Sequence, residues 1–180
     1  ANMLCNAGLL HLLQQRFDEA LDHLEAALSV AKDLGHARLE CIVLCNLGIV
    51  YERLGRPGEA QAHFEAAVRL AHALGDPLSE GQFLGYLGLL HARQGRQGEA
   101  RDCLDSGEAM LRGGSDQFGL GVLLTSRAEV HYLAGDAVAA TASLAAASAI
   151  AAEVGAGPTS EVGLALARVN TLIAPPRKRN

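Results

Sequence analysis

Apolar residues recur at intervals of three and four along almost the whole chain, in stretches long enough for several helical turns, separated by short polar connections. Between residues 38 and 54, for example, the apolar positions fall on one face of a helix: Leu39, Ile42, Val43, Leu47 and Val50. This spacing is typical of amphipathic helices. The pattern predicts helices over 1–14, 17–34, 38–54, 57–74, 78–94, 97–112, 117–134, 136–154 and 159–173.

Helix-ending and helix-starting residues stand between these stretches. Gly55 follows one stretch, and Pro57 opens the next as a first-turn proline. Asp76 precedes Pro77 in the same way, as an N-cap before a first-turn proline. We also expect Asp116 and Asp136 to cap later helices, Pro158 to start the last helix, and Gly35, Gly75 and Gly155 to end three others.

The pattern repeats at a fixed interval of about 40 residues, which is within the range of known helical repeats. Residues that lie 40 positions apart form a column of the repeat. One column is alanine throughout: Ala20, Ala60, Ala100 and Ala140. Two further columns hold small residues and one holds large apolar residues: Gly8, Gly48, Gly88 and Ala128; Ala27, Ala67, Gly107 and Ala147; and Leu24, Phe64, Leu104 and Leu144. A fixed period of this length indicates stacked helix pairs. The predicted repeats are about 1–37, 38–77, 78–117 and 118–157, within a single domain of 1–173.

The ends of this array differ from its middle. Leu164 falls in the repeat column of Leu124, so the ninth helix, 159–173, is expected to begin a fifth repeat and to cap the stack. The tail at 174–180 is expected to be disordered and basic. Gly81, Gly85 and Gly88 recur in the first helix of the third repeat, and Gly88 lies in the small-residue column, which favours close helix packing over a soft point in the stack.

Charge and cysteine content exclude several classes of protein. A net charge of −5 argues against a nucleic-acid-binding face. We find no stretch of about 18 apolar residues and therefore expect no membrane contact. The four cysteines form no CxxC pair and are expected to be reduced and structural, which favours the cytoplasm: Cys5, Cys41, Cys45 and Cys103.

No catalytic or metal-binding arrangement stands out. His23 and His63 share one column, and His11, His91 and His131 share another, but successive repeats are separated by about 10 Å, too far for two ligands of one ion. The glycine-rich stretch at 112–115 lacks the lysine and the preceding strand of a phosphate loop. We therefore expect no enzyme activity, no metal and no cofactor.

The columns resemble those of the tetratricopeptide repeat family. The residues that carry the resemblance are the small residue at Gly8, the ring at Tyr51, and the Ala20, Leu24 and Ala27 columns, with 46–51 (NLGIVY) the best match. The family's usual repeat is about 34 residues long with a proline after the second helix, whereas this chain has the longer period and lacks that proline. It therefore resembles the long-helix variant found in the C-terminal regions of large bacterial regulators. The resemblance implies an all-α, right-handed superhelical solenoid of antiparallel helix pairs.

In that family the first helix of each pair lines a concave groove. The resemblance therefore implies a partner-binding set made of Asn6, Asn46, Tyr86, Ser126, Ile49, Arg53, Leu89 and Arg93. Asparagine in the first column binds the backbone of an extended peptide, because its amide offers a donor and an acceptor together. Apolar and cysteine residues occupy the places of the family's carboxylate clamp, so a chaperone-tail ligand is not expected.

Two functions follow from this resemblance. The first is a non-catalytic scaffold that binds a peptide or a partner domain in its groove, within a larger bacterial regulatory protein. The second is a small-ligand sensor domain of a multidomain signalling ATPase or transcription regulator. The first helix carries Met3, Leu10 and Leu13 without a preceding cap, so we also expect a homodimer through the N-terminal helix pair.

Overall fold

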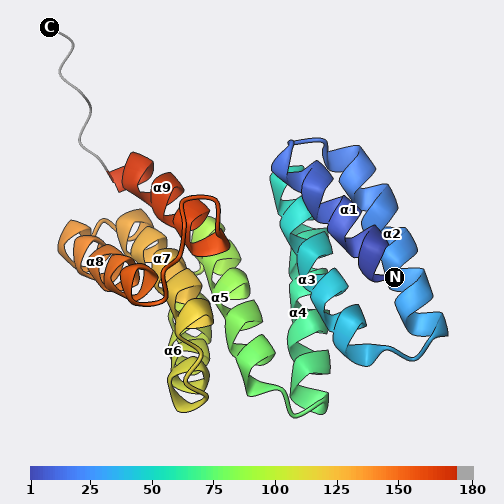
Figure 1. Cartoon of the computed structure of the whole chain (residues 1–180). Coiled ribbons are helices and arrows are strands. Elements are labelled where there is room, and N and C mark those ends of the chain that lie inside the picture. The colour runs from blue at the N-terminus through green and yellow to red at the C-terminus, as the bar shows by residue number, and fades with distance from the viewer. Residues whose placement is uncertain (174–180) are drawn as a thin grey trace, which may run out of the picture. The chain divides into compact units, whose positions relative to one another are not determined.

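The computed structural model describes residues 1–173, and within them the chain forms α-helices and no strands (Figure 1). The helices are α1 (Asn2–Leu13), α2 (Phe17–Asp33), α3 (Ala37–Arg53), α4 (Pro57–Ala73), α5 (Pro77–Arg93), α6 (Gln97–Gly113), α7 (Gln117–Leu133), α8 (Ala137–Glu153) and α9 (Glu161–Ile173). All nine predicted helices are confirmed, with ends that differ by at most two residues. The expected disorder of 174–180 lies outside the described residues.

Helices α2 to α8 share one length and one spacing. Each has 17 residues, and their starts are evenly spaced along the chain, from Phe17 and Ala37 to Gln117 and Ala137. Three-residue connections of this kind turn the chain back on itself, so consecutive helices run antiparallel. One period of the sequence therefore corresponds to two helices of equal length and two turns of equal length.

Each turn contains one residue with left-handed backbone conformation. Glycine takes this position in six of the eight turns, for example Gly35 at φ 63° and Gly135 at φ 80°. Gln15 and Ser115 adopt the same conformation at φ 58° and 59°, although residues with a Cβ rarely do so. Two helices are capped as the sequence predicts. Asp116, before α7, accepts a hydrogen bond from the backbone N–H of Gly119, and Asp136, before α8, accepts one from the backbone N–H of Ala139.

The chain divides into two compact units, residues 1–83 and residues from 84 onward, with the boundary inside α5. In the first unit, α1 packs on α2, α3 on α4, α2 on α3, and α1 also meets α3. In the second unit, α7 packs on α6, α8 and α9, and α8 packs on α9. Within each unit, therefore, a helix packs against its neighbours in sequence (Figure 1).

Small residues form the contact inside each helix pair. Ala20, Ala60, Ala100 and Ala140 are all fully buried. A Cβ atom added to Gly48 would lie 2.6 Å from Cε1 of Phe64, and one added to Gly88 would lie 3.0 Å from the carbonyl oxygen of Ala100. The close packing expected at Gly88 is confirmed.

The last helix departs from the predicted register. Leu164 is 44% exposed, whereas Leu124, in the same repeat column, is 4% exposed. The fully buried residues of α9 are Val162 and Val169. Thus α9 does not continue the column of Leu124, and the prediction for Leu164 is wrong.

The cause is the segment before α9. Pro158 lies in a turn outside the helix, where the Ser160 N–H donates to the carbonyl oxygen of Gly157 at 3.0 Å, so the predicted start at Pro158 is also wrong. The hydroxyl of Ser160 accepts from the N–H of Gly163 at 3.1 Å and caps the helix instead. Helix α9 therefore begins at Glu161, whereas the even spacing of the earlier helices would start it at Gly157.

The contact between Gly48 and Phe64 generates a stability prediction. Gly48→Ala places a methyl group against a ring that is itself fully buried, so we expect unfolding free energy to fall by about 1–3 kcal/mol. Gly58→Ala, in the same unit, is the matched control, because no neighbouring atom lies within 4 Å of the Cβ that it adds. Chemical denaturation monitored by circular dichroism measures both changes. Equal stabilities for the two variants would contradict the close-contact interpretation.

Candidate functional site

In the N-terminal unit, the expected partner-binding residues differ in their access to solvent. Asn6 on α1 and Arg53 on α3 are exposed, and Ile49 is half-buried. Asn46 is only 8% exposed, and its Nδ2 donates to Sγ of Cys5 at 3.6 Å. This bond joins α1 to α3, so the first helices of successive pairs lie side by side in this unit.

In the C-terminal unit, most of the expected residues are buried or bound within the chain. Leu89 is 4% exposed and Ser126 is 3% exposed. The half-buried Tyr86 donates its hydroxyl to the carboxylate of Glu161, at the start of α9. The sequence did not predict this bond between α5 and α9.

A buried carboxylate binds the remaining expected residue, Arg93. Glu129 on α7 has a side chain that is 7% exposed, and its Oε1 accepts from Nε of Arg93 at 2.9 Å and from Nη2 at 2.6 Å. Arg168 on α9 places Nη1 3.1 Å from Oε2. Burying one charge without a partner is costly, and here two guanidinium groups from two helices compensate for it. The triad therefore joins α5, α7 and α9.

A second ion network lies between α6 and α7. Nη2 of Arg127 is 2.8 Å from Asp105 and 3.0 Å from Glu108, and its side chain is 17% exposed. Glu108 also pairs with Arg112 at 2.7 Å along α6. These contacts join two consecutive helices and explain why an arginine occupies α7 at this point.

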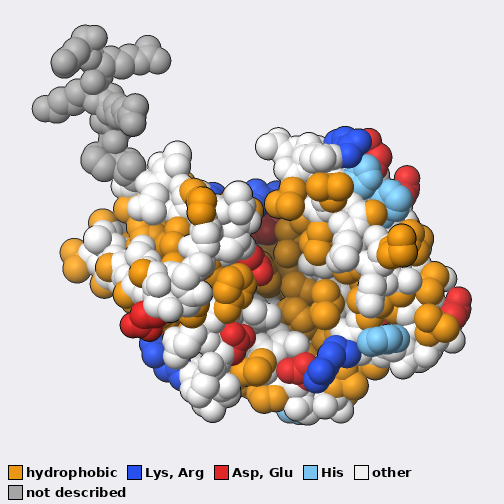
Figure 2. All heavy atoms as spheres, in the orientation of Figure 1, with side chains coloured by type: hydrophobic (Ala, Val, Ile, Leu, Met, Phe, Trp, Pro, Cys, Tyr) orange, Lys and Arg blue, Asp and Glu red, His pale blue; other side chains and the backbone are white. Residues whose placement is uncertain are grey.

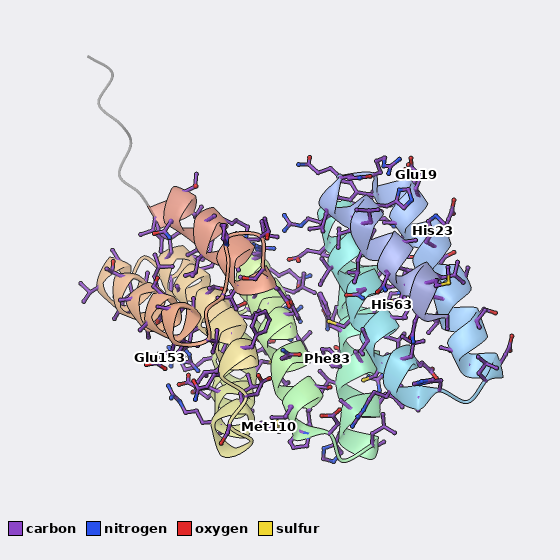
Figure 3. All side chains as sticks on the ribbon, in the orientation of Figure 1. Glu19, His23, His63, Phe83, Met110 and Glu153 are labelled. Carbon is purple, nitrogen blue, oxygen red and sulfur yellow. The ribbon has the colours of Figure 1, made fainter. Side chains whose placement is uncertain are left out.

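Two aromatic stacks occupy equivalent positions in the first two repeats. The rings of His11 and His23 stack with centroids 4.9 Å apart, and those of Tyr51 and His63 stack at 5.1 Å. His23 and His63 lie on α2 and α4, the second helices of their pairs (Figure 3). Thus the histidine columns face each other within a pair, which the sequence analysis missed although both columns have the same period.

The surroundings of His63 oppose its protonation. Burial lowers the pKa of His63 below its ordinary value, and the ammonium group of Lys32 adds to this, while Glu25 and Glu59 act in the opposite direction. The hydroxyl of Tyr51 donates to Glu25 at 3.3 Å. The guanidinium of Arg56 lies 4.7 Å from the centre of the same ring. Burial in the stack therefore favours the neutral form of His63.

The cysteines are packed as small apolar groups. Cys5, Cys41 and Cys45 are buried, and Cys103 is half-buried. Burial raises the pKa of the Cys41 thiol to about 11, helped by the carboxylates of Asp76 and Glu40. Its Sγ also donates to the carbonyl oxygen of Ala67 at 3.2 Å. Such a thiol stays protonated near neutral pH and is a poor nucleophile.

Residues 1–173 hold no group of three or more His, Cys, Asp or Glu side chains that could bind a metal ion. An open apolar hollow of ≈ 590 Å³ lies on α8, lined by Ala137, Val138, Thr141, Ala142 and Ala145. None of the expected partner-binding residues lines this hollow. None of the described helices is both long and apolar enough to cross a membrane.

The triad around Glu129 generates a second prediction. Arg168→Ala removes one of the two cations from a buried carboxylate, so we expect unfolding free energy to fall by about 1–2 kcal/mol. Arg101→Ala, at an exposed position on α6, should change it by less than about 0.5 kcal/mol. Thermal melts of both variants measure the difference, and equal melting temperatures would show that the pair with Arg168 adds nothing.

The lowered pKa of His63 generates a third prediction. The unfolded chain binds a proton at this residue more readily than the folded chain does, so stability is complete above about pH 6.5 and falls as the pH drops below that value. His63→Phe keeps a ring in the stack and removes the titration. Denaturation at several pH values should therefore show a smaller acid-induced loss of stability in this variant than in the wild type. Parallel pH profiles would refute this prediction.

The fold is similar to that of several solved structures. Superposition on the crystal structure of BtubC from P. vanneervenii gives a TM-score of 0.67 at 19% identity, covering 87% of this chain and 65% of that one. Aspartyl phosphate phosphatase F from Bacillus subtilis gives 0.75 at 15% identity, covering 96% and 44%. A putative kinesin light chain with nearly identical TPR-like repeats, from Podosopora anserina, gives 0.65 at 17% identity, covering 94% and 84%.

This chain therefore spans less than two thirds of the first two of these proteins. At such identities the likeness shows the fold alone. A search of curated proteins finds no match to the sequence.

A family model covers most of the chain. The model described as "Tetratricopeptide repeat" matches residues 1–73 and again residues 39–113. The two matches start close to successive repeats of the sequence and agree with the helix pairs of the structure. The chain therefore belongs to the tetratricopeptide repeat family, an all-α family of helical-repeat proteins.

Proposed function

We propose that this chain is a non-catalytic interaction module that binds a peptide or a partner domain with side chains of the first helices of its pairs. Tetratricopeptide repeats generally bind proteins or peptides, and that general role supports the proposal. The observation that carries it is the exposure of Asn6 on α1 and of Arg53 on α3, the helix on which Ile49 is half-buried. Together they offer an amide, a cation and an apolar surface.

The eight expected residues contribute unequally to the proposed contact. Asn6, Ile49 and Arg53 are accessible to a ligand as they stand. Asn46 and Arg93 already bind within the chain, so their donors reach a ligand only if it competes with Cys5 or Glu129. The hydroxyl of Tyr86 is likewise bound to Glu161, so a ligand would have to compete with that carboxylate. We assign direct contact to the first group. Leu89 and Ser126 are buried in the C-terminal unit, so they are not accessible to a ligand as they stand.

The same proposal includes the setting of the module. It would act in the bacterial cytoplasm, as part of a larger regulatory protein and without direct contact with nucleic acid. The net charge of −5 and the resemblance to long-helix repeats of bacterial regulators support this setting. Copies of the chain would also associate through the N-terminal helix pair, where Met3, Leu10 and Leu13 are exposed.

Peptide binding is tested with a ligand selected for the purpose. A displayed library of random peptides is selected on the immobilised chain, and an enriched peptide is resynthesised for calorimetry. We expect Asn6→Ala to weaken its binding about fivefold, the equivalent of one net hydrogen bond. Arg53→Ala should weaken an acidic peptide and reduce the salt dependence of its binding.

Arg69→Ala is the matched control, because Arg69 is an exposed arginine on the second helix α4, where it pairs with Glu65 at 3.7 Å. It should bind the peptide as the wild type does. A peptide that binds all variants equally, or that loses affinity only with Arg69→Ala, would show that the first helices do not form the binding surface.

A further inference from the structure

Helix α9 binds the side of α5 and α7 that carries the expected partner-binding columns. The carboxylate of Glu161 accepts the hydroxyl of Tyr86, a member of the expected set. Arg168 lies 3.1 Å from Oε2 of the buried Glu129, which stands in the repeat column of Ile49. In the C-terminal unit, therefore, α9 contacts the columns that a ligand would contact.

The bond to Tyr86 indicates that α9 does more than extend the stack. Tyr86 lies on α5, and α7 separates α5 from α9 in the order of the first helices. Successive first helices are about 10 Å apart, so a helix that continued a straight stack would lie about 20 Å from α5. Tyr86 instead packs against the cluster of Val122, Ala151 and Val162, besides its bond to Glu161. The start of α9 therefore leans across α7 to α5 (Figure 1).

The contacting residues of α9 form a repeated pair. Glu161 and Val162 are followed seven residues later by Arg168 and Val169, so both pairs fall on one face of the helix. Both valines are fully buried. Both charged residues of α9 belong to these pairs, and its outer side in Figure 2 carries mainly hydrophobic and uncharged side chains. The surface on α5 and α7 therefore fits a helix with an acid and a valine in its first turn and a base and a valine two turns later.

The connection before α9 holds the helix on this surface. A Cβ atom added to Gly163 would collide with the carbonyl oxygen of Gly157 and lie 2.9 Å from Cα of Pro158. Both are backbone atoms, which cannot turn aside as the end of a flexible side chain can. Glycine at this position thus lets α9 lie close to its own connection, apart from the residues of α5 and α7 that bind it.

We propose that α9 is an internal ligand of the C-terminal unit, on a surface that binds an amphipathic partner helix carrying the same two pairs. The partner helix displaces α9 by competing for Tyr86 and Glu129. The side chain of Arg168 is 34% exposed, so this competition can begin from solvent. The proposal names the ligand class for one part of the proposed interaction module and rests on that function. Because α9 is tethered, it competes at a high effective concentration and keeps partner binding weak in the wild type.

A synthetic peptide of residues 159–173 is the probe, and fluorescence anisotropy measures its binding to the whole chain. Gly163→Ala in the chain forces α9 away from its connection and leaves α5 and α7 unchanged. We expect this variant to bind the peptide at least about tenfold more tightly than the wild type does. Gly113→Ala, in α6 of the same unit, is the matched control, since no neighbouring atom lies within 4 Å of its added Cβ. It should bind the peptide as the wild type does.

Paired substitutions locate the bound peptide. Tyr86→Phe in the Gly163→Ala chain removes the hydroxyl that Glu161 accepts, so it should weaken binding of the native peptide about fivefold. It should leave the affinity of a peptide with Glu161→Ala unchanged. A peptide with Val169→Asp should not bind, whereas one with Thr171→Ala, at an exposed position of α9, should bind as the native peptide does.

Circular dichroism checks the fold, and Arg168→Ala, which removes one contact of α9, replaces Gly163→Ala if that variant unfolds. A peptide that binds neither chain, binds the variant no better than the wild type, or ignores Tyr86→Phe overturns α9 as an internal ligand. Such a result leaves the proposed contact at Asn6 and Arg53 standing. Conversely, a selected peptide that is indifferent to Asn6→Ala and Arg53→Ala refutes that contact and leaves the α9 result unchanged.

Discussion

The close approach of small residues inside each helix pair is the constraint on which the rest of the structure depends. The alanine column at 20, 60, 100 and 140 is fully buried, and the glycines opposite leave no room for a further methyl group against Leu24 or Phe64. Close approach lets each large side chain contact both helices of a pair, which increases the dispersion energy of the core. The equal lengths of α2 to α8 follow, because only equal helices keep these columns aligned over several pairs.

This packing also determines what the first helices can offer to a ligand. In the N-terminal unit the first helices α1 and α3 lie side by side, so a polar side chain can be bound by the next helix instead of a ligand. Asn46 is bound in this way by Cys5. In the C-terminal unit the same is true of Arg93, through Glu129. Asn6 and Arg53, by contrast, are exposed on α1 and α3.

Most of the fold could be predicted from the sequence, because helix periodicity, turn glycines and a constant repeat all indicate the same helices. The register of α9 could not be predicted, because placing Leu164 in the column of Leu124 assumes a three-residue turn before the helix. The connection between α8 and α9 is longer than that. The candidate site was harder to predict, since burial depends on neighbours that spacing alone does not show. One signal was present: Glu129 interrupts a column otherwise filled by Leu9, Ile49 and Leu89, and a charge in an apolar column requires a partner.

The displaced register of α9 has a consequence for how such arrays can change. Each residue added to a connection rotates the following helix by about 100° about its axis, since a turn contains about 3.6 residues. In a middle helix, packed on both sides, this rotation would expose one core face and bury charges on the other. Helix α9 packs on α7 and α8, and there Val162 and Val169 take over the burial while Arg168 reaches Glu129. An insertion in the connection before such a helix is thus a route by which a repeat protein can present a new surface while every preceding helix pair stays as it was.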